Sequence, residues 1–179
     1  MSARFGSAWV VTILCCSLCA CSMFGGGGGG PRSFAATEKP AEEAGPLGGP
    51  SLSQRRETME RMYKDLVHFR TAIEHADERG DDAAAGQLAY FVGAYINMHL
   101  DPLLAGEWQS RHPELFGLDA DLRIAKADVF MRMNERGQAS DVLDEVEKRY
   151  SGRADMLVHY PVGGQNPLGK AVKLLRESN

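Results

Sequence analysis

Apolar side chains recur at helical spacing from residue 51 onwards. Between Ser51 and Gly80 they lie three or four residues apart, which places them on one stripe of an α-helix. The stripe consists of Met59, Met62, Tyr63, Leu66, Phe69 or Arg70, and Ile73. Ser51 or Ser53 can cap the start, and Gly80 suits the left-handed residue that follows a helix end. We predict a helix of about 25 residues here.

The same spacing predicts two more helices before Pro113. The first begins at Asp81 or Asp82 and ends near His99. Its inner face is expected to carry Leu88, Phe91, Val92, Tyr95 and Ile96. The second is short and runs through Trp108, with Asp101 as its N-cap and Pro102 as its first residue.

Three helices are predicted after Pro113. Residues 119–137 place Leu122, Ala125, Val129 and Met133 on one face, and Gly137 is expected to end this helix. Residues 138–152 place Val142, Leu143, Val146 and Tyr150 on one face. A loop with a brief extended stretch at 156–160 leads to a last short helix containing Val172, Leu174 and Leu175. Because no convincing strand pair appears, the predicted fold class is all-α.

Composition and charge narrow the function classes. The chain is 44% apolar and 25% charged, as in ordinary globular proteins. Its net charge is −4, so no overall positive field attracts nucleic acid, and no basic run replaces one locally. We therefore expect no nucleic-acid partner.

The first 20 residues read as a targeting segment. Arg4 precedes an apolar run from Ala8 to Leu14, the layout of a secretory signal peptide. As a transmembrane anchor the run is short, because crossing the hydrocarbon takes about 20 apolar residues.

All four cysteines lie at the end of this segment, at positions 15, 16, 19 and 21. Leu18-Cys19-Ala20-Cys21 resembles the lipobox of bacterial lipoproteins, which has Leu three residues before an obligatory Cys and a small residue just before it. Cys19 stands where that family more often has Ala, Ser or Thr. The resemblance implies cleavage after residue 20 and acylation of Cys21, which anchors the chain in a lipid bilayer. Ser22, in place of Asp, favours the outer membrane, with the protein facing the periplasm.

Other uses of the cysteines fit less well. Cys16 and Cys19 form a C-x-x-C pair without the βαβ context of a redox site. Haem attachment needs a His directly after the second Cys, and Ala20 stands there. A zinc site needs a second pair of ligands, and the chain has no cysteine outside this segment to supply it. Cleavage before Cys21 leaves no free thiol, which suits an oxidising compartment.

Residues 21–50 are predicted to be a lipidated cysteine followed by a disordered linker. Nine glycines and four prolines fill half of positions 25–50. The remaining positions hold too few large apolar residues to form a core. The glycine run lacks the strand and helix that flank a phosphate-binding loop. A flexible coil of this length reaches roughly 30 Å, so the helical domain, residues 51–179, is expected close to the membrane.

The stretch from Ala125 to Tyr150 resembles one helix–turn–helix of the tetratricopeptide repeat type, with small residues at Ala125, Ala127 and Ala139. The tripeptide Glu-Arg-Gly occurs at 78–80 and again at 135–137, which suggests two equivalent turns. The usual 34-residue period is absent. Stacked hairpins of this type and an ordinary bundle both remain open, with about five helices in either.

No catalytic, metal or cofactor site is predicted. Residues 164–170 match the G-x-x-x-x-G-K pattern of a phosphate-binding loop. That loop needs Ser or Thr as the next residue, and this chain has Ala171 there. His68 and His75 share a helix face without a third metal ligand. No Ser/His/Asp set is recognisable from the sequence, because a catalytic triad is defined by its three-dimensional geometry and not by sequence spacing. A set of methionines and aromatics is either core or a partner groove, and its spacing favours core: Met59, Met62, Met131, Met133, Phe91, Tyr95 and Trp108.

These observations together predict a membrane-anchored envelope lipoprotein that is not an enzyme. Its helical domain is expected to bind or assemble an envelope protein partner. One alternative is a pilotin-like factor that carries an outer-membrane component of a secretion or pilus machine. Another is a periplasmic enzyme with an unrecognised active site. Partner, pathway and oligomeric state leave no mark in the sequence.

Overall fold

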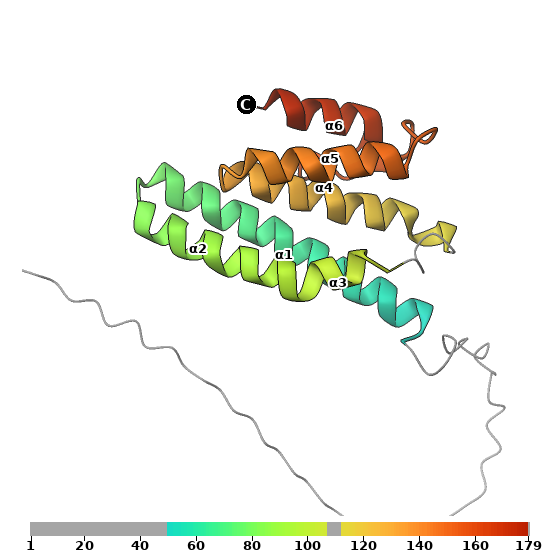
Figure 1. Ribbon diagram of the computed structural model, residues 1–179, viewed down its shortest axis with the longest axis horizontal. Helices are drawn as coiled ribbons and strands as arrows, with labels where there is room; N and C mark the ends of the chain where they lie inside the picture. Colours follow the sequence, from blue (N-terminus) through green and yellow to red (C-terminus); the bar gives the residue numbers. More distant parts are fainter. Residues whose placement is uncertain (1–49, 107–111, 179) are drawn as a thin grey trace, which may run out of the picture. The chain divides into compact units, whose positions relative to one another are not determined.

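The computed structural model describes residues 50–106 and 112–178, and helices make up most of them (Figure 1). The predicted all-α class is confirmed. The predicted signal peptide, Cys21, the linker up to residue 49 and Trp108 lie outside the described residues. In the described part, the strands are a two-residue antiparallel pair, β1 (Leu157–Val158) and β2 (Asn166–Pro167).

Helix α1 (Leu52–Glu78) begins and ends as the sequence predicts. Ser51 is the N-cap, and its hydroxyl accepts a hydrogen bond from the backbone N–H of Gln54. The Gln54 side chain accepts one in return from the Ser51 backbone N–H at 2.9 Å, which completes a capping box. Gly80 follows the helix with φ +63°, a conformation that costs glycine little.

Helix α2 (Asp82–Tyr95) continues without a break into a π-helical turn, η1 (Ile96–Leu100), and then into α3 (Asp101–Leu104). The prediction that Asp101 caps a separate helix is wrong, because Asp101 itself has helical φ and ψ. Its backbone N–H donates to the carbonyl of Ile96, five residues earlier, so the chain passes through a wider turn instead of stopping. Helix α3 ends at Leu104, before the predicted end at Trp108.

Helix α4 (Phe116–Arg132) follows a 3₁₀ turn, η3 (Pro113–Leu115), and precedes α5 (Arg136–Arg149). Gly137 does not end α4 as predicted; it lies inside α5. The residue that reverses the chain is Asn134, with φ +60°. Asparagine is the residue other than glycine that most readily adopts this conformation.

The two helix–helix turns have the same hydrogen bonds, which makes Asn134 the counterpart of Gly80. In the first turn, the Asp81 N–H donates to the carbonyl of Ala76; in the second, the Glu135 N–H donates to the carbonyl of Phe130. Both are the six-to-one bond of a Schellman motif. The repeated Glu-Arg-Gly tripeptide is therefore out of register with the structural equivalence, since Arg136 and Gly137 are already helical.

Helices α1 and α4 pack side by side and run in the same direction (Figure 1). Arg56 donates to the carbonyl of Glu114, and Arg70 donates to the carboxylate of Asp128 at 2.8 Å; in both pairs the partner is 58 positions further along. A constant offset is what two parallel helices produce. The hairpins α1–α2 and α4–α5 are thus stacked with their first helices parallel.

A four-residue ion network ties these two helices together. The Glu74 carboxylate lies 2.6 Å from the Arg70 guanidinium and 3.2 Å from that of Arg132. The Asp128 carboxylate also pairs with Arg70. Asp128 is buried, and burial raises the pKa of its carboxyl, although Arg70 and Arg132 act in the opposite direction.

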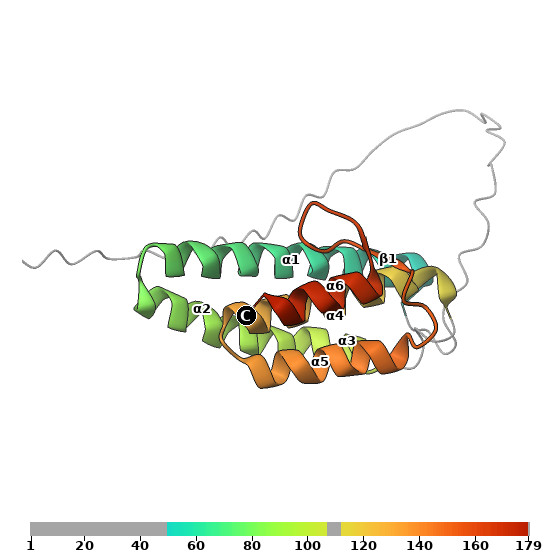
Figure 2. The same ribbon diagram turned by 90° about the horizontal axis from the view of Figure 1, so that it is seen from above.

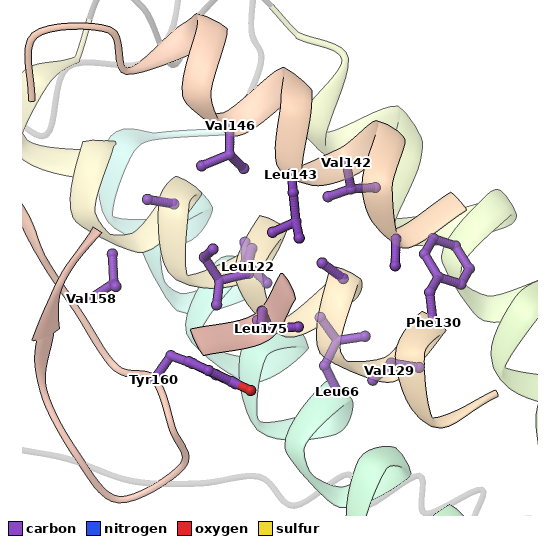
Figure 3. Close-up of a cluster of buried hydrophobic side chains, with 14 of the residues drawn as sticks. Leu66, Leu122, Val129, Phe130, Val142, Leu143, Val146, Val158, Tyr160 and Leu175 are labelled. Carbon is purple, nitrogen blue, oxygen red and sulfur yellow. The ribbon is translucent and has the colours of Figure 1, made fainter. Parts of the chain in front are cut away.

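Helix α6 (Leu168–Glu177) packs on α4 and α5 and closes the core. In Figure 3, side chains of α1, α4, α5 and α6 meet with Val158 and Tyr160. Of the three apolar residues named for the last helix, Val172 and Leu175 are buried and Leu174 is exposed. The predicted inner faces of α4 and α5 are confirmed at Leu122, Val129, Val142, Leu143, Val146 and Tyr150.

The segment between β1 and β2 extends over α1 (Figure 2). The Tyr63 hydroxyl donates to the backbone carbonyl of His159 at 3.0 Å, which holds the segment to that helix. The predicted extended stretch at 156–160 is confirmed in β1.

Candidate functional site

Most of α2 and all of η1 lack charged side chains apart from the ionisable His99. From Ala83 to Leu100 the chain has no Asp, Glu, Lys or Arg. Val92 is nevertheless the one buried residue of α2 itself, while Tyr90 is 83% and Met98 64% exposed. Because a contiguous apolar surface in water is unfavourable, such surfaces usually mark sites of interaction.

A hollow of about 440 Å³ lies along one side of α2. Its wall on α2 and η1 is formed by Ala89, Tyr90, Gly93, Ala94 and Asn97. The floor is formed by Phe130 and Met133 of the α4 end, and the opposite edge by Glu135 and Gln138. In Figure 3 the Phe130 ring lies at the edge of the core cluster, on the opposite side of the view from Val158. This hollow is the first of two that together make up what we call the furrow, and we call it the apolar half.

A second hollow, of about 220 Å³, lies beside α3, α4 and α5. It is lined by Asp101, Leu104, Ala105, Arg123, Lys126 and Glu145. The Lys126 ammonium contacts the Asp101 carboxylate at 2.6 Å, and Arg123 contacts Glu145 at 2.7 Å. The side chains of Asp101 and Glu145 are 40% and 52% exposed, against 15% for Lys126 and 4% for Arg123. The two carboxylates are thus more exposed than the cations that pair with them, and Arg123 is shared with a third carboxylate, that of Asp119. We call this hollow the acidic half.

One stripe of α4 connects the two halves. Arg123, Lys126, Phe130 and Met133 follow each other at spacings of three, four and three residues, which places them on one helix face. The first two line the acidic half and the last two the apolar half. Lys126 also lies over the Phe130 ring, 5.5 Å from its centre. The two hollows thus lie one after the other along one face of α4, and we refer to them together as the furrow.

A buried polar cluster supports the acidic half from below. Asp119 is fully buried, and its Oδ2 accepts from Arg123 Nε at 2.8 Å and from the Tyr150 hydroxyl. Arg123 also donates to the carbonyl of Leu104 at 2.8 Å, which holds α3 against α4. Burial and the neighbouring Asp119 carboxylate raise the pKa of Tyr150 well above its usual value of 10. This cluster fixes the position of Arg123 in the furrow floor.

The second polar cluster joins Asp121 of α4 to His159. Carboxylate-oriented histidines serve as general bases in many enzymes. Here the other ring nitrogen, Nε2, lies 3.0 Å from the Gln165 side-chain amide. The adjoining cavity, between Tyr63, Arg70, Tyr160 and Val162, is about 10 Å³, room for about one water molecule. The geometry is that of a clamp for the β1–β2 segment.

The residues singled out in the sequence fall in different places. Met59 is fully buried, while Met62, Met131 and Met133 are partly buried against the core. Met133 also lines the furrow. Phe91 was expected to face inwards but is mostly exposed, because α2 packs on α1 along one side only; its ring contacts Phe69 edge-on at 5.7 Å between centres.

The two histidines that the sequence places on one helix face, His68 and His75, are both exposed, and the His75 ring lies 3.5 Å from the Glu78 carboxylate. Within residues 50–106 and 112–178, no three His, Cys, Asp or Glu residues are grouped to hold a metal ion. Sequence reasoning missed the furrow. The signal that could have indicated it is the uncharged run from 83 to 100 in a chain that is one-quarter charged.

Comparisons with protein-family models, with curated proteins and with solved structures find no match for this chain. Among the helices that the structure describes, none combines the length and the hydropathy needed to cross a bilayer.

Proposed function

We propose that this protein is a bacterial envelope lipoprotein, anchored through Cys21, whose helical domain binds a protein partner in the furrow. The observation that carries the binding proposal is a largely exposed α2, without charged side chains after Asp82, beside a hollow of about 440 Å³. Solvent-exposed aromatic residues such as Tyr90 are typical anchors of protein interfaces.

The stacking of the two hairpins supports the same proposal. Proteins built from stacked helical hairpins bind their partners along extended concave surfaces. Here the arrangement leaves the side of α4 between α2 and α5 uncovered, and the furrow lies there. The lipobox at Leu18–Cys21 and the glycine-rich linker support a domain held within roughly 30 Å of a membrane.

The anchor is tested by Cys21→Ala in the full chain, expressed in bacteria. We expect the unmodified chain to be cleaved before Cys21, labelled by radioactive palmitate and recovered with the outer membrane. The variant should remain uncleaved, unlabelled and absent from the outer-membrane fraction. Cys19→Ala is the matched control and should behave like the unmodified chain. Palmitate labelling that persists in Cys21→Ala would refute the anchor.

The binding proposal is tested by photo-crosslinking in cells from a benzophenone amino acid placed at Tyr90. We expect a protein adduct at this position and none from the same group at Lys170, which is exposed on α6, away from the furrow residues. If Tyr90 yields no protein adduct, the furrow does not bind a protein. A partner that moves away from the outer membrane in Cys21→Ala cells would identify the pilotin-like version of this function.

A further inference from the structure

We infer that the furrow receives an amphipathic α-helix of a partner protein, with small or apolar side chains in the apolar half and Lys or Arg side chains in the acidic half. This inference rests on the proposed function and specifies the form and the charge of the partner.

A helix fits the furrow better than an extended peptide because the walls and floor are helical. Along both walls the backbone groups are already used within α2, η1, α3 and α5. An extended peptide gains affinity by pairing its backbone with a free sheet edge, and the described strands, β1 and β2, do not line the furrow. A helix satisfies its own backbone groups and needs side-chain packing alone.

The length of the furrow also suits a helix. Its wall extends from Ala89 to Ala105 along a nearly continuous helical path. At a rise of 1.5 Å per residue this path is about 24 Å long, the length of a four-turn helix.

Small residues let a helix approach α2 closely. Ala89, Gly93 and Ala94 present little side chain to the furrow, and a Cβ built at Gly93 meets no atom within 4 Å. Glycine inside a helix costs about 1 kcal/mol relative to alanine. Among the described residues no packing contact requires Gly93 or Gly86, but Gly93 alone of the two lines the furrow, and there its small size would let a partner approach closely.

Charge selects a basic partner. Asp101 and Glu145 expose their carboxylates in the acidic half, and Glu135 lies at the far edge of the apolar half. The furrow cations, Lys126 and Arg123, pair with Asp101 and Glu145 but are much more buried than they are, and Arg123 also pairs with the buried Asp119. Lys or Arg on the bound helix would meet these carboxylates. An anionic bilayer would be repelled by the same groups, and a flat bilayer does not fill a concave furrow.

The experiment again uses the full chain in cells with the photoreactive group at Tyr90, followed by mapping of the crosslinked peptide. We expect a segment of helical periodicity with at least one Lys or Arg near the site. Gly93→Leu should reduce the adduct about tenfold by blocking close approach. The matched control is Gly86→Leu, an exposed glycine of α2 outside the furrow with equally open space, and it should leave the adduct unchanged.

The charge is tested by Asp101→Asn combined with Glu145→Gln, which we expect to reduce the adduct several-fold, on the order of the loss of two exposed ion pairs. Its control, Asp144→Asn with Glu147→Gln, removes two exposed carboxylates of α5 that contact Arg176 of α6, and should have no effect. Circular dichroism confirms that each variant is folded.

The outcomes separate the two proposals. A protein adduct that survives Gly93→Leu, survives loss of the furrow carboxylates or maps to a segment without Lys or Arg overturns the helix inference and leaves the binding function standing. An adduct with a second copy of this chain also overturns the inference. An adduct with lipid alone, or none, overturns both.

Discussion

Both carboxylate oxygens of Asp121 bind His159, 38 positions further along the chain. Oδ1 accepts from the His159 backbone N–H at 2.6 Å, and Oδ2 lies 2.8 Å from Nδ1 of the ring. Asp121 is buried, whereas the His159 side chain is exposed. A buried carboxylate of α4 is thereby satisfied by a surface segment, and that segment is held to α4.

Replacing Asp121 by Ala should release the β1–β2 segment. The substitution leaves the His159 N–H without its acceptor, and we expect a loss of about 1–3 kcal/mol in the free energy of unfolding. Urea denaturation measures the loss, and hydrogen exchange at the amides of 157–160 should accelerate. Asp155→Ala removes an exposed carboxylate just before β1 and should change stability by less than about 0.5 kcal/mol. Equal exchange rates in the two variants would contradict the clamp.

Tyr150 should make stability fall at alkaline pH. In the folded chain its pKa is raised far above 10 by burial and by Asp119, while in the unfolded chain it ionises near pH 10. Above pH 10 the unfolded state therefore releases a proton that the folded state keeps, and stability falls as the pH rises.

Tyr150→Phe provides the comparison. At pH 8 it should be less stable than the unmodified chain by about 1–3 kcal/mol, because Asp119 loses a hydrogen-bond donor. Between pH 10 and 11 the difference should narrow, since the variant has no hydroxyl to ionise. Guanidinium denaturation at each pH measures it, and a difference that widens above pH 10 would contradict the assigned direction of the pKa shift.

Two adjacent leucines of α6 should differ sharply. Leu175→Ala removes a fully buried side chain and should cost about 2–5 kcal/mol. Leu174→Ala removes an exposed one and should cost less than about 1 kcal/mol. Thermal or urea denaturation distinguishes them, and similar losses would show that α6 is rotated relative to the packing described.

The turn between α4 and α5 should tolerate glycine but not alanine at position 134. Asn134 has φ +60°, which costs an alanine about 1–2 kcal/mol and a glycine much less. We expect Asn134→Gly to preserve stability and Asn134→Ala to lower it by about 1 kcal/mol. Gly80→Ala, at the equivalent turn, should resemble Asn134→Ala. An unchanged urea midpoint for Asn134→Ala would mean that this turn is not left-handed in solution.

Gly93→Ala should stabilise the isolated protein. The added methyl meets no atom within 4 Å and removes backbone entropy from the unfolded chain. A gain of about 0.5–1 kcal/mol is expected, measured by urea denaturation. A loss of stability would show that Gly93 is required by the fold itself, which would remove one support for the helix-binding inference.

Helix boundaries were predictable where a local cap decides them. The capping box at Ser51 and the left-handed Gly80 bound α1 as predicted, because both signals act within one turn of chain. Two other helix boundaries were predicted wrongly, in each case because the local backbone conformation differed from the one expected. Asn134 took the role assigned to Gly137, and the π-turn before Asp101 carried the chain through an expected helix start.

Inner faces were predictable only where neighbours cover the whole face. Helix α5 packs against α4, and its predicted positions are all buried. Helix α2 has the same apolar spacing but is covered mainly by α1, so Phe91 remains exposed. Periodicity gives the apolar stripe of a helix, but not whether another element packs on each part of it.

The sequence by itself determined the helical class, most helix ranges and the hypothesis of a lipid anchor at Cys21, because these depend on residues close together in the chain. The tertiary structure decided the rest: the parallel stacking of α1 on α4, the partners of Asp119, Asp121 and Asp128, and the furrow between α2 and α5. Those features join residues tens of positions apart. Their physical basis is packing and the need to satisfy buried charge, neither of which leaves a periodic signal in the sequence.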